Sequence, residues 1–260
     1  MTAMRTRESL AAAELLDRAG VPGDGVLFLH SAFRRLGAVG FRAEAFIEGL
    51  IDYMRHGTLA VPTMTWRVVT PANPWFDELE TASHVGIVAE LFRRHYATHR
   101  SLHPTHSVAA YGRRAAELTA THHQGDTPCA LTSPYGRARE MDTHVLLLGI
   151  GLERCTAIHH AEEMVAPEVY LFPPEAAETY QCRARDGSVH PMRLRRHLRL
   201  NRDFPQFAAP LTARGLMRHG ELAGTPWQAV SQRDLLGEIF AALERNPRAI
   251  IAPPGAPVIP

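Results

Sequence analysis

The apolar positions of the chain recur with two different spacings, and the two alternate along the sequence. Glu8 to Ala19 and Phe41 to His56 carry apolar side chains along one helical face. Val26 to His30 and Thr58 to Thr63 are short, continuous apolar runs entered from glycine, which is the pattern of a buried strand. This alternation predicts an α/β fold in which some neighbouring strands are parallel.

The same alternation continues to about residue 172. Helices are expected over Val85 to Tyr96 and Arg113 to His122, and strands over Ser107 to Tyr111 and His144 to Ile150. Thr65 to Ala82, which is rich in Thr, Pro, Asn and Trp, predicts a long loop between two of these elements. Long loops in compact domains are often functional, so this segment is a candidate part of a site.

The pattern changes after Pro173 and Pro174. Asp186-Gly187 between two β-like segments predicts a hairpin, and two helical patterns follow it. The expected elements are strands over Thr179 to Arg185 and Val189 to Arg195, and helices over Phe204 to Ala213 and Gln232 to Arg245. No repeat or low-complexity linker interrupts the chain. We therefore expect one domain over residues 1–260, with an α/β lobe at about 1–172 and a hairpin-and-helix lobe at about 173–260.

Charge and cysteine content exclude several classes of protein. The formal net charge is +1, which gives no nucleic-acid footprint. The basic residues other than histidine are all Arg, so lysine Schiff-base chemistry is excluded. The cysteines Cys129, Cys155 and Cys182 form no CxxC pair, which argues against a disulfide framework or a cysteine zinc site. No apolar run approaches the roughly 20 residues of a membrane span, and no secretory pattern opens the chain. A cytoplasmic protein is expected.

Three segments carry candidate chemistry. The first is His30-Ser31-Ala32-Phe33, at the end of a predicted strand, where ligands of α/β sheets usually bind. The second runs from Arg100 to Ser107, and its cation, hydroxyls and imidazoles suit a diphosphate or the amides of a pantetheine arm. The third is Thr156 to Glu163, in which a helix would put His159 on the same face as Glu162 and Glu163. Histidine is the natural general base near neutral pH.

Taken in order, these segments and several others resemble the aminoglycoside 3-N-acetyltransferase family over about Leu27 to Pro247. The stretches that carry the resemblance are His30-Ser31-Ala32-Phe33 with Leu36-Gly37, Gly57-Thr58-Leu59 with Val61-Pro62-Thr63, Gly86-Ile87-Val88-Ala89-Glu90 with Phe92-Arg93, Arg100-Ser101 with His103-Pro104 and His106-Ser107-Val108, Ser133-Pro134, Val145-Leu146-Leu147-Leu148-Gly149, and Thr156 with His159 and Ala161-Glu162. Their joint order and spacing are specific, although no single stretch is.

The resemblance implies a mixed sheet flanked by helices, acetyl-CoA as the co-substrate, no metal, and direct acetyl transfer to a primary amine of an aminoglycoside or related small molecule. It implies His159 as the general base. The residues that it implies for coenzyme A contact are His30, Ser31, Ala32, Phe33, Thr63, Arg100, Ser101, His103, Ser107, Ser133 and Pro134.

Two features depart from the family pattern. The segment Arg193 to Arg199 is strongly basic where family members tend to be acidic, which favours an anionic or neutral acceptor over a polycation. The carboxylate that would orient His159 has no secure counterpart, with Asp203 the first candidate and Glu162 the second. A carboxylate in this place would fix the tautomer of the ring and stabilise the imidazolium.

Two other functions stay open from the sequence. One is a metal-dependent hydrolase that uses His103, His106, His159 and a carboxylate, although no HExxH spacing is present. The other is a non-catalytic CoA-binding protein that has kept the fold. The expected partner is a small-molecule amine, with neither nucleic acid nor a membrane, and a homodimer is one of the open assembly states.

Overall fold

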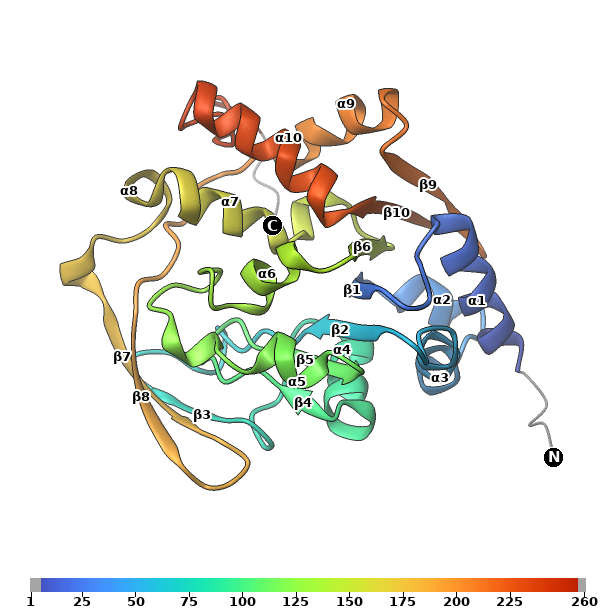
Figure 1. The fold of residues 1–260 in the computed structure, drawn as a ribbon, viewed down its shortest axis with the longest axis horizontal. Helices are drawn as coiled ribbons and strands as arrows, with labels where there is room; N and C mark the ends of the chain where they lie inside the picture. The colour runs from blue at the N-terminus through green and yellow to red at the C-terminus, as the bar shows by residue number, and fades with distance from the viewer. Residues whose placement is uncertain (1–5, 257–260) are drawn as a thin grey trace.

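The computed structural model describes residues 6–256, and a seven-stranded sheet forms their centre (Figure 1). Its strand order is β4-β5-β2-β1-β6-β10-β9. The strands are β1 (Val26–Ser31), β2 (Thr58–Pro62), β4 (His99–Arg100), β5 (Val108–Gly112), β6 (Thr143–Leu148), β9 (Met217–Leu222) and β10 (Thr225–Ser231). β1 pairs in parallel with β2 on one side and β6 on the other, and the remaining pairs are antiparallel. The expected mixed sheet is confirmed.

Both faces of the sheet are buried, which explains why its central strands are continuous apolar runs. Successive strand residues point to opposite faces. Phe28 and Val145 accordingly belong to one core, whereas Leu27 and Leu146 belong to the other. Helices cover both cores.

The helices fall into two groups according to the core that they cover. Over the core that contains Phe28 lie α5 (Ala115–Thr119), α6 (Pro134–Arg137), α7 (Ala157–Val165), α9 (Ala208–Ala213) and α10 (Gln232–Arg245). Over the core that contains Leu27 lie α1 (Arg7–Ala19), α2 (Arg34–Ala38), α3 (Ala43–Tyr53) and α4 (Ile87–Leu91). The helix expected over Val85 to Tyr96 begins as α4 and ends as a π-helical turn, η1 (Phe92–Tyr96).

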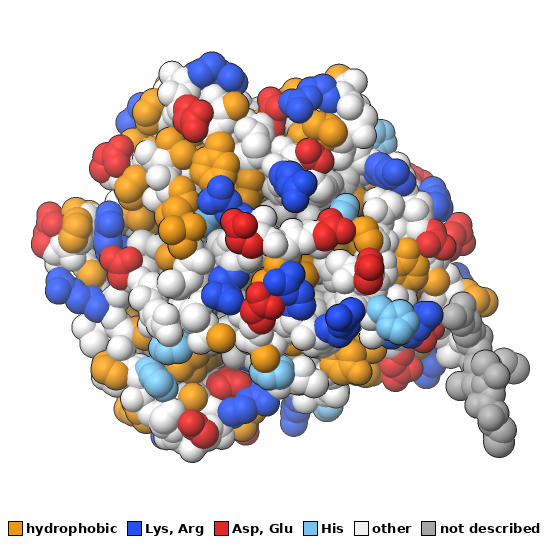
Figure 2. Space-filling model, in the orientation of Figure 1, with side chains coloured by type: hydrophobic (Ala, Val, Ile, Leu, Met, Phe, Trp, Pro, Cys, Tyr) orange, Lys and Arg blue, Asp and Glu red, His pale blue; other side chains and the backbone are white. Residues whose placement is uncertain are grey.

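Short helices complete the chain. They are α8 (Pro167–Tyr170) and the 3₁₀ turns η2 (His122–Gln124), η3 (Ala138–Glu140), η4 (Leu152–Arg154), η5 (Pro174–Ala176) and η6 (Phe204–Phe207). Across residues 6–256, no helix combines the length and the apolar character that crossing a membrane requires. On the face shown in Figure 2, arginine and acidic side chains are interspersed.

A second sheet of three strands lies beside the main one. It consists of β3 (Trp75–Asp77), β7 (Glu178–Arg183) and β8 (Val189–Leu194), in the order β3-β7-β8. The expected hairpin is confirmed, and Gly187 adopts the positive φ (85°) that its turn requires. β3 is a strand within the segment expected to be a loop, and its Phe76 packs with Tyr180 and Met192 in a small core.

The hairpin formed by β9 and β10 was not predicted. It joins the main sheet, where β10 pairs antiparallel with β6. Leu236 and Ile239 of α10 pack in the same core as Val145. The change of character near residue 172 therefore does not coincide with a break in the main sheet or in its core.

Candidate active site

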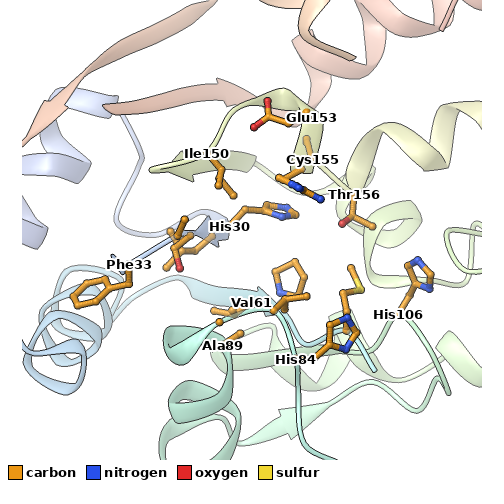
Figure 3. A pocket seen from close by; sticks show the side chains of 18 of the residues that line it. His30, Phe33, Val61, His84, Ala89, His106, Ile150, Glu153, Cys155 and Thr156 are labelled. Carbon is orange, nitrogen blue, oxygen red and sulfur yellow. The ribbon is translucent and has the colours of Figure 1, made fainter. Parts of the chain in front are cut away.

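The carboxyl ends of β1, β2 and β6 open on a cavity of about 680 Å³. β1 has a parallel neighbour on each side, β2 on one and β6 on the other. The connections that leave the carboxyl ends of these strands therefore diverge, and a crevice forms between them at β1. Figure 3 shows the cavity with Phe33 at one end and His106 at the other. Ile150, Glu153 and Thr156 line one side, and Val61, His84 and Ala89 line the opposite side.

His159 lines this cavity from the first turn of α7. Its Nδ1 lies 2.7 Å from Oε2 of Glu162, one helical turn further along, and Arg202 Nε donates to Glu162 Oε1 at 2.7 Å. Burial would raise the pKa of Glu162, but charge interactions and hydrogen bonds with His159 and Arg202 lower it to about 2. The carboxylate is therefore ionised, and it favours the tautomer of a neutral His159 ring that donates from Nδ1 and keeps the lone pair on Nε2.

Asp203, the first candidate for the carboxylate beside His159, lies elsewhere. Its side chain accepts the Gln206 N–H at 3.2 Å and caps the short helix η6. The i, i+3 spacing on α7 brings Glu162 to the ring instead. The preferred candidate is therefore corrected from Asp203 to Glu162.

The strand-end motif lies where it was expected. His30, Ser31, Ala32 and Phe33 all line the cavity. His30 is buried, no described residue hydrogen-bonds its Nε2, and burial lowers its pKa to about 4, so the ring is uncharged. Gly149 has a φ of 72°, and a Cβ there would lie 2.6 Å from the Ala32 carbonyl oxygen. Glycine thus lets the chain after β6 approach the motif closely.

Within the Arg100 to Ser107 segment, His106 lines the cavity, whereas Arg100 and Ser107 lie behind the lining. Arg100 is buried and donates to Ser107 Oγ at 3.1 Å and to the carbonyl oxygens of Glu78 and Thr81. The Thr63 and Ser107 hydroxyls lie 3.0 Å apart beside it. These groups already have partners within the protein. The contacts expected between coenzyme A and these side chains are not supported by the geometry.

Four other expected contact residues are fully buried outside the lining. Ser101 Oγ lies 2.8 Å from the His122 ring, and His103 Nδ1 accepts backbone N–H groups of the loop that follows it. Ser133 caps α6, and Pro134 is the first residue of that helix. Their contact with a cofactor stays a prediction.

The sequence did not single out three arginines of the lining. Arg34, Arg67 and Arg154 line the cavity, and Glu153 is the one carboxylate among the described residues that line it. Arg34 follows the strand-end motif directly, Arg67 lies within the long loop Thr65 to Ala82, and Arg154 lies two residues before the Thr156 to Glu163 segment. The nearness of these arginines to the predicted segments was therefore the signal in the sequence that could have identified them.

The basic segment Arg193 to Arg199 does not contribute to the lining. Arg195 donates to the Phe172 carbonyl oxygen, and Arg196 pairs with Glu178 at 2.5 Å. This basic segment therefore gives no reason to expect an anionic acceptor. Positive charge at the site comes instead from the arginines of the cavity.

Comparison with known proteins decides the family. Residues 28–244 match the sequence profile described as aminoglycoside 3-N-acetyltransferase, which is most of the chain. The chain belongs to this family. The resemblance stated from the motifs is thereby confirmed.

Relatives and solved structures agree with the family. The chain is 31% identical to aminoglycoside N(3)-acetyltransferase III of Pseudomonas aeruginosa over 161 residues, which are 55% of this chain and 59% of that protein. It is 26% identical to aminoglycoside N(3)-acetyltransferase IV of a Salmonella species over 95% of this chain and 91% of that protein. A solved structure of a histidine-to-alanine mutant of aminoglycoside acetyltransferase AAC(3)-IVa in complex with a gentamicin matches with a TM-score of 0.80 and 26% identity, and the match covers 98% of this chain and 95% of that chain.

Proposed function

We propose that the protein transfers the acetyl group of acetyl-CoA directly to a primary amine of a small molecule. The observation that carries this proposal is the His159–Glu162–Arg202 arrangement beside a 680 Å³ cavity in a chain of this family. The pair of His159 and Glu162 supplies a general base whose tautomer is fixed by the carboxylate. Acetylation of an amine requires such a base.

His159 Nε2 is the proton acceptor in this mechanism. The neutral amine attacks the thioester carbonyl carbon while Nε2 takes the amine proton, so that the N–C bond forms. The C–S bond then breaks, and the imidazolium returns the proton to the leaving sulfur, which yields the amide and free coenzyme A. Glu162 is ionised beside Nδ1 and favours the imidazolium in between.

Coenzyme A brings phosphates and a developing oxyanion to the site. Arg34 and Arg154 are cavity arginines without an ion pair among the described residues, and they are the candidate phosphate ligands. The Ala32 N–H already donates to the Leu148 carbonyl at 2.8 Å, which removes it as an oxyanion donor. Thr156 is the candidate donor, because it lines the cavity and its side chain does not cap α7.

The charge of the cavity favours an acceptor that is anionic or neutral. With Arg34 and Arg154 assigned to the phosphates of coenzyme A, Arg67 is the cavity arginine left for the acceptor, and it is balanced by one carboxylate, Glu153, whose Oε1 accepts the Gly151 N–H. An aminoglycoside carries several ammonium groups and needs carboxylates to bind them. The relatives are described as aminoglycoside acetyltransferases, whereas this lining favours an amine bearing a carboxylate or phosphate, or no charge.

A thiol-release assay tests the proposed function. The purified protein is given acetyl-CoA with separate aminoglycosides, amino sugars and anionic amino compounds. We expect release with at least one anionic or neutral amine and slower release with aminoglycosides. Preferential release with aminoglycosides contradicts the proposed acceptor class, and absence of release with every amine contradicts the transferase.

The metal-dependent hydrolase remains a weaker alternative. His159, Glu162 and His197 place ligand atoms within 4.8 Å of one another. However, the Arg202 guanidinium already bonds Glu162, and a second cation there would be repelled. His103, which this alternative used, has its Nδ1 bonded to backbone N–H groups. Stoichiometric metal in the purified protein with metal-dependent hydrolysis favours the alternative. Tight CoA binding without turnover of any amine would instead favour a non-catalytic CoA-binding protein.

A further inference from the structure

A second histidine lies against the His159 ring. His197, in the segment after β8, stacks on it with ring centroids 4.3 Å apart and planes 25° apart. His197 is nearly buried, with 10% of its side chain exposed. Parallel stacking at this distance restricts rotation of the His159 ring about its bond to the helix.

His197 has its own carboxylate, and it is the residue that follows Glu162. Glu163 Oε1 lies 2.7 Å from His197 Nε2. Glu163 is also held by the Thr127 hydroxyl at 2.5 Å and by the Cys129 N–H at 2.9 Å. Consecutive glutamates of α7 thus each contact one of the two stacked rings.

Charged and titratable groups face this pair from several elements, and His103 and His106 of the Arg100 to Ser107 segment are both among those next to His197. The α7 neighbours are His159, His160 and Glu162, and Cys129 contacts Glu163 from the loop before α6. The His106 ring lies edge-on to His197 at 5.8 Å, and Arg202 faces it across Glu162. His106 and His197 have pKa values well below the usual range, because both rings are buried and next to other histidines. Both rings are therefore uncharged.

We propose that His197 and Glu163 are positioning residues that hold the His159 ring in its working orientation and supply a negative charge when His159 takes up the amine proton. The inference rests on the proposed function of His159. It concerns residues that do not touch the reacting atoms.

The total charge of His197 and Glu163 changes within the pH range in which the enzyme would work. Burial raises the pKa of Glu163 to about 7, although the hydrogen bonds from Thr127 and Cys129 act to lower it. With Glu163 protonated the pair is uncharged, and once the proton is lost the pair carries one negative charge. That charge next to His159 stabilises the imidazolium. Turnover should therefore rise as Glu163 loses its proton.

Glu163→Gln separates this role from simple packing, because the amide keeps the shape and cannot ionise. We expect kcat at pH 8 to fall about tenfold, as expected for losing one nearby charge in a partly screened site. KM for both substrates should change less than twofold. The acidic limb of kcat/KM should move to lower pH, since the imidazolium of His159 is no longer favoured. Glu163→Asp should restore part of kcat.

Two variants serve as controls. Glu168→Gln makes the same chemical change at an exposed position of α8, and His190→Phe replaces a histidine of β8 outside the cavity. Both should retain wild-type kcat and pH profile. An unmoved acidic limb and a kcat within twofold of wild type in Glu163→Gln overturn the proposal. A lower melting temperature alone indicates a structural role and overturns it too.

A spectroscopic titration keeps the inference testable even where a variant fails to fold. The His159 ring resonances of the wild-type protein, assigned with His159→Asn, should show a second inflection near neutral pH from ionisation of the pair. A single inflection overturns the inference. This measurement needs no turnover, so its result is separate from that of the transferase assay.

Discussion

Replacing Glu162 with Gln removes the carboxylate that contacts the proposed base. The side chain is fully buried and accepts from both His159 Nδ1 and Arg202 Nε at 2.7 Å. The neutral amide cannot stabilise an imidazolium, and it also leaves the Arg202 guanidinium without its counter-ion. We expect turnover to fall by about 10²–10⁴, the range for a residue that orients and stabilises a catalytic histidine.

The same substitution has a calculable effect on stability. The pKa of Glu162 is lowered from 4.5 to about 2, which corresponds to about 3 kcal/mol of stabilisation. Because the folded pKa is the lower one, this contribution is fully present above about pH 4.5 and is lost as the pH falls through about 2. At pH 7 the variant should lose about 3 kcal/mol, or roughly 6–12 °C in melting temperature for a chain of this size.

The assay is thiol release from acetyl-CoA at saturating substrates, with a thermal melt of the same preparation. Glu168→Gln is the matched control and should match wild type in both. Asp203→Ala removes the cap of η6 and should cost about 1 kcal/mol of stability with kcat within threefold of wild type. A folded Glu162→Gln protein with kcat within threefold of wild type would refute the role given to Glu162.

Three further results follow from the buried groups. Arg100 donates from Nη1 to the Glu78 and Thr81 carbonyls and from Nε to Ser107 Oγ, and the single ammonium of Arg100→Lys cannot reproduce both sets of bonds. The variant should therefore cost about 1–3 kcal/mol in urea unfolding and leave the KM for acetyl-CoA within twofold. A tenfold rise in KM would instead restore the expected CoA contact. Gly57→Ala puts a Cβ 2.4 Å from the Gly25 carbonyl oxygen, and we expect it to lower the stability by more than about 2 kcal/mol. A melting temperature equal to that of the wild type would contradict this close approach. Burial lowers the pKa of His30 from the ordinary 6.5 to about 4, so the unfolded chain binds more protons at this site. The wild-type protein should therefore lose about 3 kcal/mol more than His30→Gln between pH 6.5 and 4. An equal loss in the two proteins excludes an uncharged buried ring.

Much of the fold was predictable because the central strands are buried on both faces. The apolar runs predicted β1, β2 and β6 and the hairpin signal predicted β7 and β8, all within a few residues. These patterns depend on local sequence and on burial, both of which the chain shows directly.

The strands β9 and β10 were missed for physical reasons. β9 is an edge strand, and its middle residues, Arg218 to Glu221, are polar and largely exposed. β10 contains Pro226, and a proline in a sequence argues against a central strand because it has no N–H for the hydrogen-bond ladder. Pairing with β6 decides both conformations, and such long-range pairing is not visible in local patterns.

The site was predictable where one helix or one strand end carries it. The strand-end motif and the His159–Glu162 spacing needed no tertiary information. Asp203 was preferred through family resemblance, and the structure shows it as a helix cap. The stacking of His197 on His159 joins residues 38 positions apart, so no spacing rule could reveal it.

The most direct test of the account is the turnover of His159→Ala in the acetyl-CoA thiol-release assay, measured with the best amine of the wild-type panel. We expect a folded protein whose kcat is lower by about 10²–10⁴. A kcat close to wild type would contradict the assignment of His159 as the general base, and the roles derived for Glu162, Glu163 and His197 with it.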